Sequence, residues 1–152
     1  MGRASGVLLA VSSLPNSYGI GTFGKEAYDF IDFLVRTKQR YWQVLPLTTT
    51  SYGDSPYQSF SAAAGSPYYI DLKDLEKLGY LKSDDFEDIS FGTSNTCVDY
   101  GALFVNHRRL LNRAFDRFMQ DVPADFEKFC HDHAEWLDPY AEFMSLKEEF
   151  EH

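Results

Sequence analysis

The chain has 152 residues, of which 44% are hydrophobic and 16% aromatic, and it carries a formal net charge of -9. This composition predicts a packed globular protein and excludes a disordered chain. The acidic balance leaves no basic surface to neutralise phosphates, which argues against nucleic acids and anionic membranes as partners. No apolar run in the sequence approaches the ~20 residues of a membrane span.

The first 45 residues follow a strand, helix, strand pattern. Residues 6–11 form a continuous apolar run, as expected of a parallel strand covered on both faces. After a turn-rich connection, Thr22 is expected to cap a helix. That helix places five apolar residues on one face: Ala27, Tyr28, Ile31, Leu34 and Val35. Residues 41–45 predict a second strand, with Trp42 in the core. Such a βαβ unit opens either a barrel or a doubly wound sheet, and periodicity does not choose between them.

A loop of aromatic and small polar residues follows the second strand. Pro46 ends the strand, and Tyr52, Tyr57 and Phe60 then stand among glycine, serine and aspartate residues. Flat rings suit the faces of a pyranose, and short polar groups suit its hydroxyls. Aromatic loops also pack against their own domain, so composition alone does not make this loop a sugar site.

Beyond the loop, the alternation of strands and helices is lost. Four leucines at helical spacing predict a short helix: Leu72, Leu75, Leu78 and Leu81. Asp71 is expected to cap this helix and Gly79 to break it, and the acidic residues 83–88 are expected to form a solvated turn or the start of a helix. Three helical faces follow, within residues 103–118, 126–133 and 140–150.

Two prolines and a histidine give further predictions for these helices. Pro123 and Pro139 each stand where a helix begins, with Asp138 as the cap before the second proline. His107 lies on the apolar face of the first of the three helices, and we expect it to be half-buried and hydrogen-bonded.

Three further patterns argue against cofactor sites. Residues 131–133 read His-Asp-His, but residues two apart on a helix point to different sides and cannot easily share a metal ion. The Gly19–Gly24 segment matches GxGxxG, yet it lies far from its strand and lacks an acidic ribose partner about 20 residues on. Cys97 and Cys130 have no metal or redox spacing, which suits a reducing cytoplasm.

Five segments resemble the N-terminal motifs of the 4-α-glucanotransferases (amylomaltases or disproportionating enzymes), in that family's order and spacing. They are RASGVLLAVSSLPNSYGIGTFGKEAYDFIDFL at 3–34, WQVLPL at 42–47, YGDSPYQSFSAAAGSPYYIDL at 52–72, VDY at 98–100 and WLDPYAEFMSLKEEF at 136–150. The chain departs from the family pattern at Ala63, Ser66 and Thr37-Lys38. The first two departures flank the loop and leave its packing and one hydroxyl contact open.

The resemblance implies an α/β fold, the N-terminal portion of a (β/α)8 TIM barrel with a helical insertion. Residues 1–72 would form the first β/α units, with a glucan-binding loop at 48–67, and residues 73–152 a mainly helical insertion subdomain. A complete barrel takes about 250 residues. We therefore expect this chain to be the front part of a longer cytoplasmic enzyme, with the remainder of its own barrel as a partner.

The activity implied is retaining transfer of a segment of an α-1,4-glucan to a new 4-hydroxyl on glucose or a maltooligosaccharide. That chemistry needs two carboxyl groups about 5 Å apart and neither metal nor cofactor. Asp54 and Asp71 make no convincing pair. In the resembled family the catalytic carboxylates lie further along the chain, so we expect no catalytic residue here and no activity from this part alone.

The resemblance also assigns candidate substrate-binding residues. Tyr57 resembles the tyrosine that lines the subsite next to the scissile bond, with Ser55 as a hydroxyl contact. Tyr52 resembles an aromatic residue that contacts glucan outside the main cleft, and Asp54 and Gln58 either orient the loop or touch sugar. Two alternatives remain: a non-catalytic glucan-binding module that uses the same loop, and a nucleotide-binding α/β domain that uses the Gly19–Gly24 loop.

Overall fold

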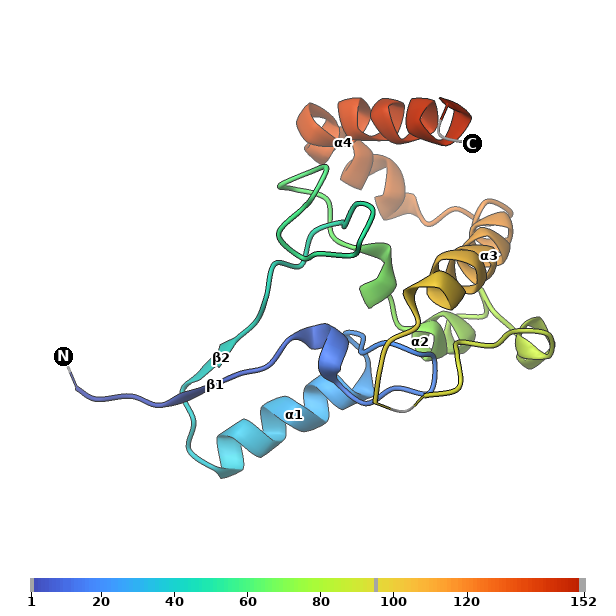
Figure 1. Cartoon of the computed structure of the whole chain (residues 1–152). Coiled ribbons are helices and arrows are strands. Elements are labelled where there is room, and N and C mark those ends of the chain that lie inside the picture. Colours follow the sequence, from blue (N-terminus) through green and yellow to red (C-terminus); the bar gives the residue numbers. More distant parts are fainter. Residues whose placement is uncertain (1, 95, 151–152) are drawn as a thin grey trace.

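The computed structural model describes residues 2–94 and 96–150, which form two short parallel strands and a series of helices (Figure 1). In chain order the elements are β1 (Gly6–Leu8), the 3-10 helix η1 (Val11–Ser13), α1 (Lys25–Arg36), β2 (Tyr41–Gln43), η2 (Pro67–Tyr69), α2 (Leu72–Lys77), η3 (Ser83–Phe86), α3 (Tyr100–Phe118) and α4 (Ala124–Phe150). Over these residues no helix has a stretch that is both long and apolar enough to cross a lipid bilayer.

The two strands pair in parallel, with α1 as the connection between them. Val7 lies opposite Trp42 in the register, and the N–H of Leu9 donates to the carbonyl of Gln43 at 3.0 Å. This arrangement confirms the predicted βαβ order. Both strands are shorter than predicted, and the apolar run of residues 6–11 leaves the sheet after Leu9 and turns into η1.

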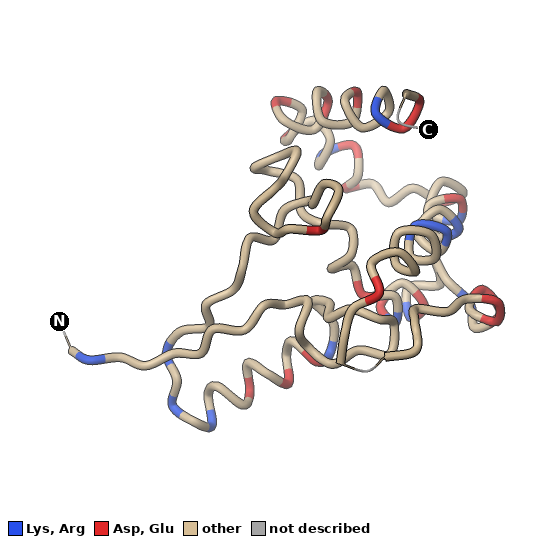
Figure 2. The backbone as a smooth tube through the Cα atoms, in the orientation of Figure 1, with Lys and Arg blue, Asp and Glu red and all other residues tan. Residues whose placement is uncertain are grey.

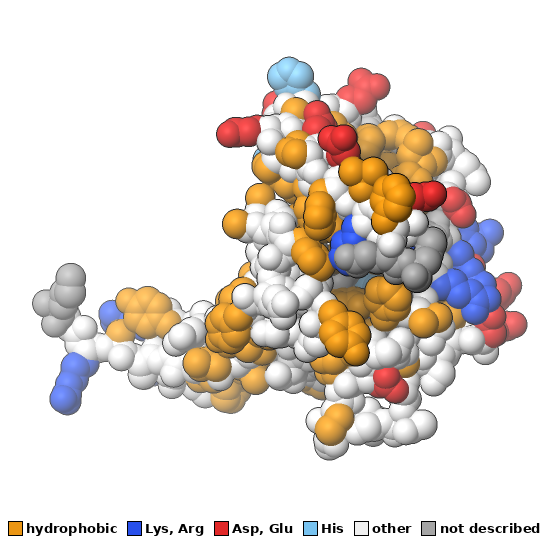
Figure 3. All heavy atoms as spheres, turned by 45° about the horizontal axis from the view of Figure 1, so that its top comes forward, with side chains coloured by type: hydrophobic (Ala, Val, Ile, Leu, Met, Phe, Trp, Pro, Cys, Tyr) orange, Lys and Arg blue, Asp and Glu red, His pale blue; other side chains and the backbone are white. Residues whose placement is uncertain are grey.

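The prediction of a strand covered on both faces is wrong for the part of the chain that the structure describes. Leu8 is 60% and Tyr41 is 65% exposed. Much of the predicted apolar face of α1 is exposed as well, including Tyr28 and Val35. Hydrophobic side chains are accordingly visible along the projecting strand pair in Figure 3. These positions have the sequence of a buried layer, but no described element packs over them.

The predicted cap of α1 is also wrong, because Thr22 makes a tertiary contact instead. The N-cap is Gly24, and the Thr22 hydroxyl donates to Oδ2 of Asp71 at 2.5 Å. That hydroxyl accepts from the amide of Asn16 at 3.1 Å and from the N–H of Gly24 at 3.3 Å. Oδ1 of Asp71 accepts from the N–H of Asp74 at 3.1 Å, which confirms Asp71 as the cap of α2. One buried Thr-Asp pair therefore joins the loop before α1 to the start of α2.

The core consists of two apolar clusters. The first contains Val11, Leu14 and Ala27, and the second contains Leu72, Leu81, Leu110 and Ala114. Trp42 packs against the first cluster, with its ring centroid 4.9 Å from that of Phe30 and its indole N–H donating to the carbonyl of Leu9 at 2.8 Å. This contact confirms the prediction that Trp42 packs in the core.

The acidic stretch 83–88 begins with η3, in agreement with the predicted turn or helix start, and it forms ion pairs in addition to being largely exposed. Arg117 of α3 donates to both carboxylate oxygens of Asp85, at 2.6 and 3.0 Å, and Arg109 pairs with Asp88 at 2.6 Å. The Arg117 guanidinium lowers the pKa of Asp85 to about 2. Basic residues along α3 beside this acidic turn are visible in Figure 2. Helix α3 is amphipathic, with arginines at helical spacing. One of its faces therefore packs against the leucines of residues 72–81, and another forms ion pairs with the acidic turn.

His107 is more deeply buried than predicted and is not hydrogen-bonded. It is 1% exposed, and its ring packs edge-on against Tyr68 at 5.7 Å between centroids. Neither ring nitrogen has a partner in hydrogen-bond geometry. Burial lowers the pKa of His107 to about 4, and the nearby backbone of Ile70 opposes this effect only in part. At neutral pH, His107 is an uncharged core residue.

Helix α4 is continuous where the sequence predicted two helices. Pro139 lies inside it and not at the start of a new one. A proline removes one backbone hydrogen bond and clashes with the preceding turn, which bends a helix. Figure 1 shows that α4 is bent and that the part following the bend passes over the segment that follows β2.

Replacing His107 with leucine is expected to flatten the pH dependence of stability. As the pH falls from 6.5 towards 4, the unfolded state binds a proton that folded His107 does not, so the wild type loses stability through this window. We expect the wild type to lose on the order of 3 kcal/mol more than His107→Leu between pH 7 and pH 4, measured by urea unfolding at a series of pH values. His131→Leu, at an exposed position, is the control. Parallel profiles for wild type and His107→Leu would contradict the assignment.

Candidate functional site

The segment after β2 is a closed loop whose base is held by backbone hydrogen bonds. The N–H of Ser66 donates to the carbonyl of Leu47 at 2.9 Å, and the N–H of Thr49 donates to that of Ala64 at 3.3 Å. Thr49 and Ala64 are both buried. The base is therefore fixed to the body of the protein, and residues 50–63 project from it.

The tip of the loop contains two tight turns. The N–H of Ser51 donates to the carbonyl of Gln58 at 3.0 Å and closes the tip. Within it, the first turn runs from Ser51 to Asp54, with Gly53 at a φ of 92° and Asp54 at 53°. Positive φ at the third turn position favours glycine, and aspartate tolerates the left-handed region better than most residues. The Gly53-Asp54 pair thus sets the shape of the tip.

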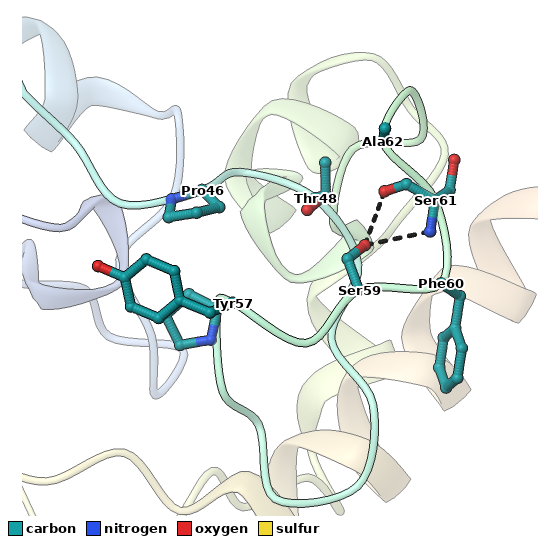
Figure 4. Close-up of a pocket in the computed structure, with 8 residues that line it drawn as sticks. Pro46, Thr48, Tyr57, Ser59, Phe60, Ser61 and Ala62 are labelled. Atoms are coloured by element: carbon teal, nitrogen blue, oxygen red, sulfur yellow. Dashed lines mark hydrogen bonds between the residues drawn. The ribbon is translucent and has the colours of Figure 1, made fainter.

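An open cavity of about 380 Å³ lies against this loop (Figure 4). Its lining residues come from the end of β2 and from the loop: Pro46, Thr48, Pro56, Tyr57, Ser59, Phe60, Ser61 and Ala62. Figure 4 shows the rings of Tyr57 and Phe60 on opposite sides of Ser59. The Ser59 hydroxyl donates to the carbonyl of Ser61 at 2.7 Å, which stiffens the wall between them. Rings and hydroxyls together form a surface that suits a sugar.

A second cavity, of about 180 Å³, lies at the carboxyl ends of the two strands and shares Pro56 with the first. Residues following β1 and β2 contribute to it, as do Asp54, Tyr68 and Tyr100. Burial raises the pKa of Tyr68 and Tyr100, and the charge of Asp54 raises both further. Both phenols therefore remain protonated and can donate hydrogen bonds. Ligand sites of parallel α/β proteins are found at this end of the strands.

The structure separates the five predicted site residues. Tyr57 lines the open cavity and is 75% exposed, whereas Asp54 lines the second cavity, with Oδ1 3.4 Å from the Thr50 hydroxyl. Ser55, Gln58 and Tyr52 line neither cavity. Ser55 accepts a hydrogen bond from the N–H of Tyr57 at 3.4 Å, and Tyr52 is fully exposed at the tip.

Sequence reasoning did not assign the two tyrosines of the second cavity. Tyr68 and Tyr100 belong to the SPYY and VDY segments, which carried the family resemblance but received no role. The sequence did contain a signal for them, since each of these two motifs carries a tyrosine.

The alternative reading of the Gly19–Gly24 segment as a phosphate loop does not fit the packing. A Cβ on Gly21 would lie 2.0 Å from the carbonyl oxygen of Val11, and one on Gly24 would lie 2.0 Å from Oδ2 of Asp71. These glycines allow close contact within the protein, and the space beside them is filled. Among residues 2–94 and 96–150 there is also no group of three His, Cys, Asp or Glu residues that could hold a metal ion.

Comparison with known proteins agrees with the motifs. The sequence model of the family described as 4-alpha-glucanotransferase matches residues 9–152. The chain belongs to the 4-alpha-glucanotransferase family. Its relatives include the 4-alpha-glucanotransferases of Streptococcus pneumoniae serotype 4, 56% identical over 98% of this chain, and of Thermus thermophilus, 48% identical over 95%.

A solved structure of the same family has the same fold over this region. The amylomaltase from Streptococcus agalactiae, in complex with acarbose, superposes with a TM-score of 0.92 at 50% identity over 98% of this chain. The chain spans about 30% of the length of that structure and about 30% of the length of the S. pneumoniae 4-alpha-glucanotransferase.

Replacing Gly53 with alanine is expected to destabilise the loop through backbone strain alone. No atom lies within 4 Å of the added Cβ, but the φ of 92° is unfavourable for alanine. We expect the free energy of unfolding to fall by about 1 kcal/mol, measured by urea unfolding. Gly65→Ala is the matched control, since its Cβ is also free of contacts and its φ is not positive. Equal effects at both positions would contradict this interpretation.

Proposed function

We propose that this chain is the N-terminal portion of a 4-α-glucanotransferase and supplies part of its glucan-binding cleft. The enzyme would transfer a segment of an α-1,4-glucan to a new 4-hydroxyl on glucose or a maltooligosaccharide. The observation that carries the proposal is a Tyr57-lined cavity beside the carboxyl ends of parallel strands, in a chain that belongs to this family. Residues 1–72 would be the first β/α units of a TIM barrel, and residues 73–152 a helical insertion.

In this proposal the aromatic loop holds the sugar and the rest of the barrel performs the chemistry. Tyr57 would stack on a glucose ring next to the scissile bond, Ser55 would bind a hydroxyl, and Tyr52 would contact glucan outside the cleft. Asp54 and Gln58 would orient the loop or contact sugar. The exposure of the Tyr57 and Tyr52 rings supports these roles, because both are available to a ligand.

The reaction would proceed with retention, through a covalent glycosyl-enzyme intermediate. Retention needs one carboxylate as nucleophile and a second carboxyl group as acid and base. Asp54 is the one carboxylate among the described residues that line the two cavities. These cavities therefore lack the required pair, and by the family resemblance both catalytic groups would lie further along the natural chain. The leaving oxygen would be protonated without a metal or an organic cofactor.

The exposed strand pair and α1 support the remainder of the barrel as a partner. A parallel pair with apolar residues on its uncovered faces is the kind of surface that further strands and helices cover. The net charge of -9 is compatible with a neutral glucan and unfavourable for nucleic acid or anionic membranes. A cytoplasmic location would suit the two free cysteines.

A non-catalytic glucan-binding module is the alternative, and the single carboxylate at the cavities favours it for this chain taken alone. Incubation with maltotriose separates the two functions. We expect redistribution of chain lengths and release of glucose by the protein at its natural full length, and none by residues 1–152. Redistribution by residues 1–152 would place catalysis within this chain, whereas inactivity of both proteins would favour the binding module.

Replacing Tyr57 with alanine is expected to lower kcat/KM for maltotriose by about tenfold or more, because an aromatic stacking partner is lost. Tyr57→Phe keeps the ring and should retain most of the activity. The measurement is kcat/KM for maltotriose in the natural full-length protein, with binding measured separately by calorimetry. If Tyr57→Ala matches the wild type in both, the assignment of Tyr57 to the site is wrong.

A further inference from the structure

Phe60 forms part of the wall of the open cavity and is held from outside by α4. The ring centroids of Phe60 and Phe143 are 5.7 Å apart, with an interplanar angle of 45°. The ammonium of Lys147 lies 4.9 Å from the centroid of the same ring. Phe143 and Lys147 are four residues apart and therefore lie on the same face of the helix. One side of α4 thus provides both an aromatic and a cationic contact to Phe60.

Helix α4 is attached to the rest of the protein on both sides of its bend. Phe126, near its start, packs edge-on against Phe118 of α3 at 5.2 Å between centroids. Near its end, Glu148 forms an ion pair with Arg108 of α3. Helix α4 is bent (Figure 1), so that its first turns contact α3 and its last turns contact both the loop and α3. The position of Phe60 therefore depends on how α4 rests on α3.

A shift of Phe60 would move the wall of the cavity. Ser59 and Ser61 flank Phe60, line the cavity with it, and are joined by two hydrogen bonds, of 2.7 and 3.2 Å. Because of these bonds, residues 59–61 move as a unit. Tyr57, on the other side of Ser59, has no ring contact with α4 among those of the described residues. The distance between Tyr57 and the wall formed by residues 59–61 is thus set from the α4 side.

We propose that Phe143 and Lys147 are positioning residues for the cavity. They act through Phe60 and set the width of the space opposite Tyr57 into which a glucose unit fits. The inference rests on the proposed function in one respect, that the ligand of this cavity is an α-1,4-glucan. Neither residue lines the cavity, so their effect on the ligand is indirect.

The test compares Phe143→Ala and Lys147→Met with Phe150→Ala in the natural full-length protein. Phe150 is in the same half of α4 and is 79% exposed, so its replacement controls for the loss of an aromatic residue from the helix. The first measurement is the initial rate of chymotrypsin cleavage within residues 52–60 under native conditions, which reports local opening of the loop. The second is KM and kcat for maltotriose.

We expect Phe143→Ala to raise both the cleavage rate and KM by roughly three- to tenfold, the range that corresponds to loss of an aromatic pair. Lys147→Met is expected to give a smaller rise in both. The kcat should change by less than twofold, because binding is disturbed and the chemistry is not. Phe143→Leu should recover most of the wild-type behaviour, and Phe150→Ala should match the wild type.

The outcomes separate this inference from the proposed function. If Phe143→Ala and Phe150→Ala have the same cleavage rate, or the same KM, the positioning role is overturned. If Phe143→Ala does not fold, Lys147→Met decides by the same criteria. If the loop opens in Phe143→Ala but even the wild type does not act on maltotriose, the proposed function fails and the support of the loop by α4 stands.

Discussion

The hydrogen bond between Thr22 and Asp71 holds together the two regions on which the candidate site depends. It joins residues 49 positions apart, and both side chains are buried. Asp71 also caps α2, whose leucines begin the second apolar cluster, while the loop containing Thr22 leads into α1 and the first. A buried carboxylate is costly unless its oxygens are hydrogen-bonded, and here each oxygen has a donor. This buried polar contact therefore helps to fix the strand pair and the helices after residue 71 relative to each other.

The candidate site lies between these two regions and is supported by both. The strand pair supplies the base of the loop, through the backbone bonds around Thr49 and Ser66. The helices after residue 71 supply two outer contacts, Tyr100 beside the second cavity and α4 beside Phe60. This arrangement explains why a loop with an exposed tip keeps a defined shape. Its affinity for any ligand benefits, since less conformational entropy is lost when a loop is already ordered.

Local patterns in the sequence predicted the elements but not the contacts between them. The apolar run at 6–11 and the YWQVL segment predicted the βαβ unit correctly, because strand and helix periodicity are local properties. Thr22 was predicted to cap α1 but forms a tertiary hydrogen bond with Asp71. A threonine hydroxyl suits both roles, so the local sequence does not distinguish them. His107 was correctly predicted on the apolar face of its helix. The lack of hydrogen-bond partners for its ring could not be predicted, because it depends on which residues pack around the ring. Pro139 begins a helix or bends one, and only its neighbours decide which.

The candidate site was predictable to the extent that its residues are contiguous. Tyr57 and the loop around it stand in one motif, and the structure places Tyr57 at a cavity. Tyr100 and Phe143 come from segments far along the chain, and they reach the loop through α3 and the bend of α4. The exposed aromatic tip and the anchored wall have different physical requirements: the tip must leave its rings open to a ligand, whereas the wall must resist displacement. A single short motif can satisfy the first requirement, but the second needs the helices that follow it.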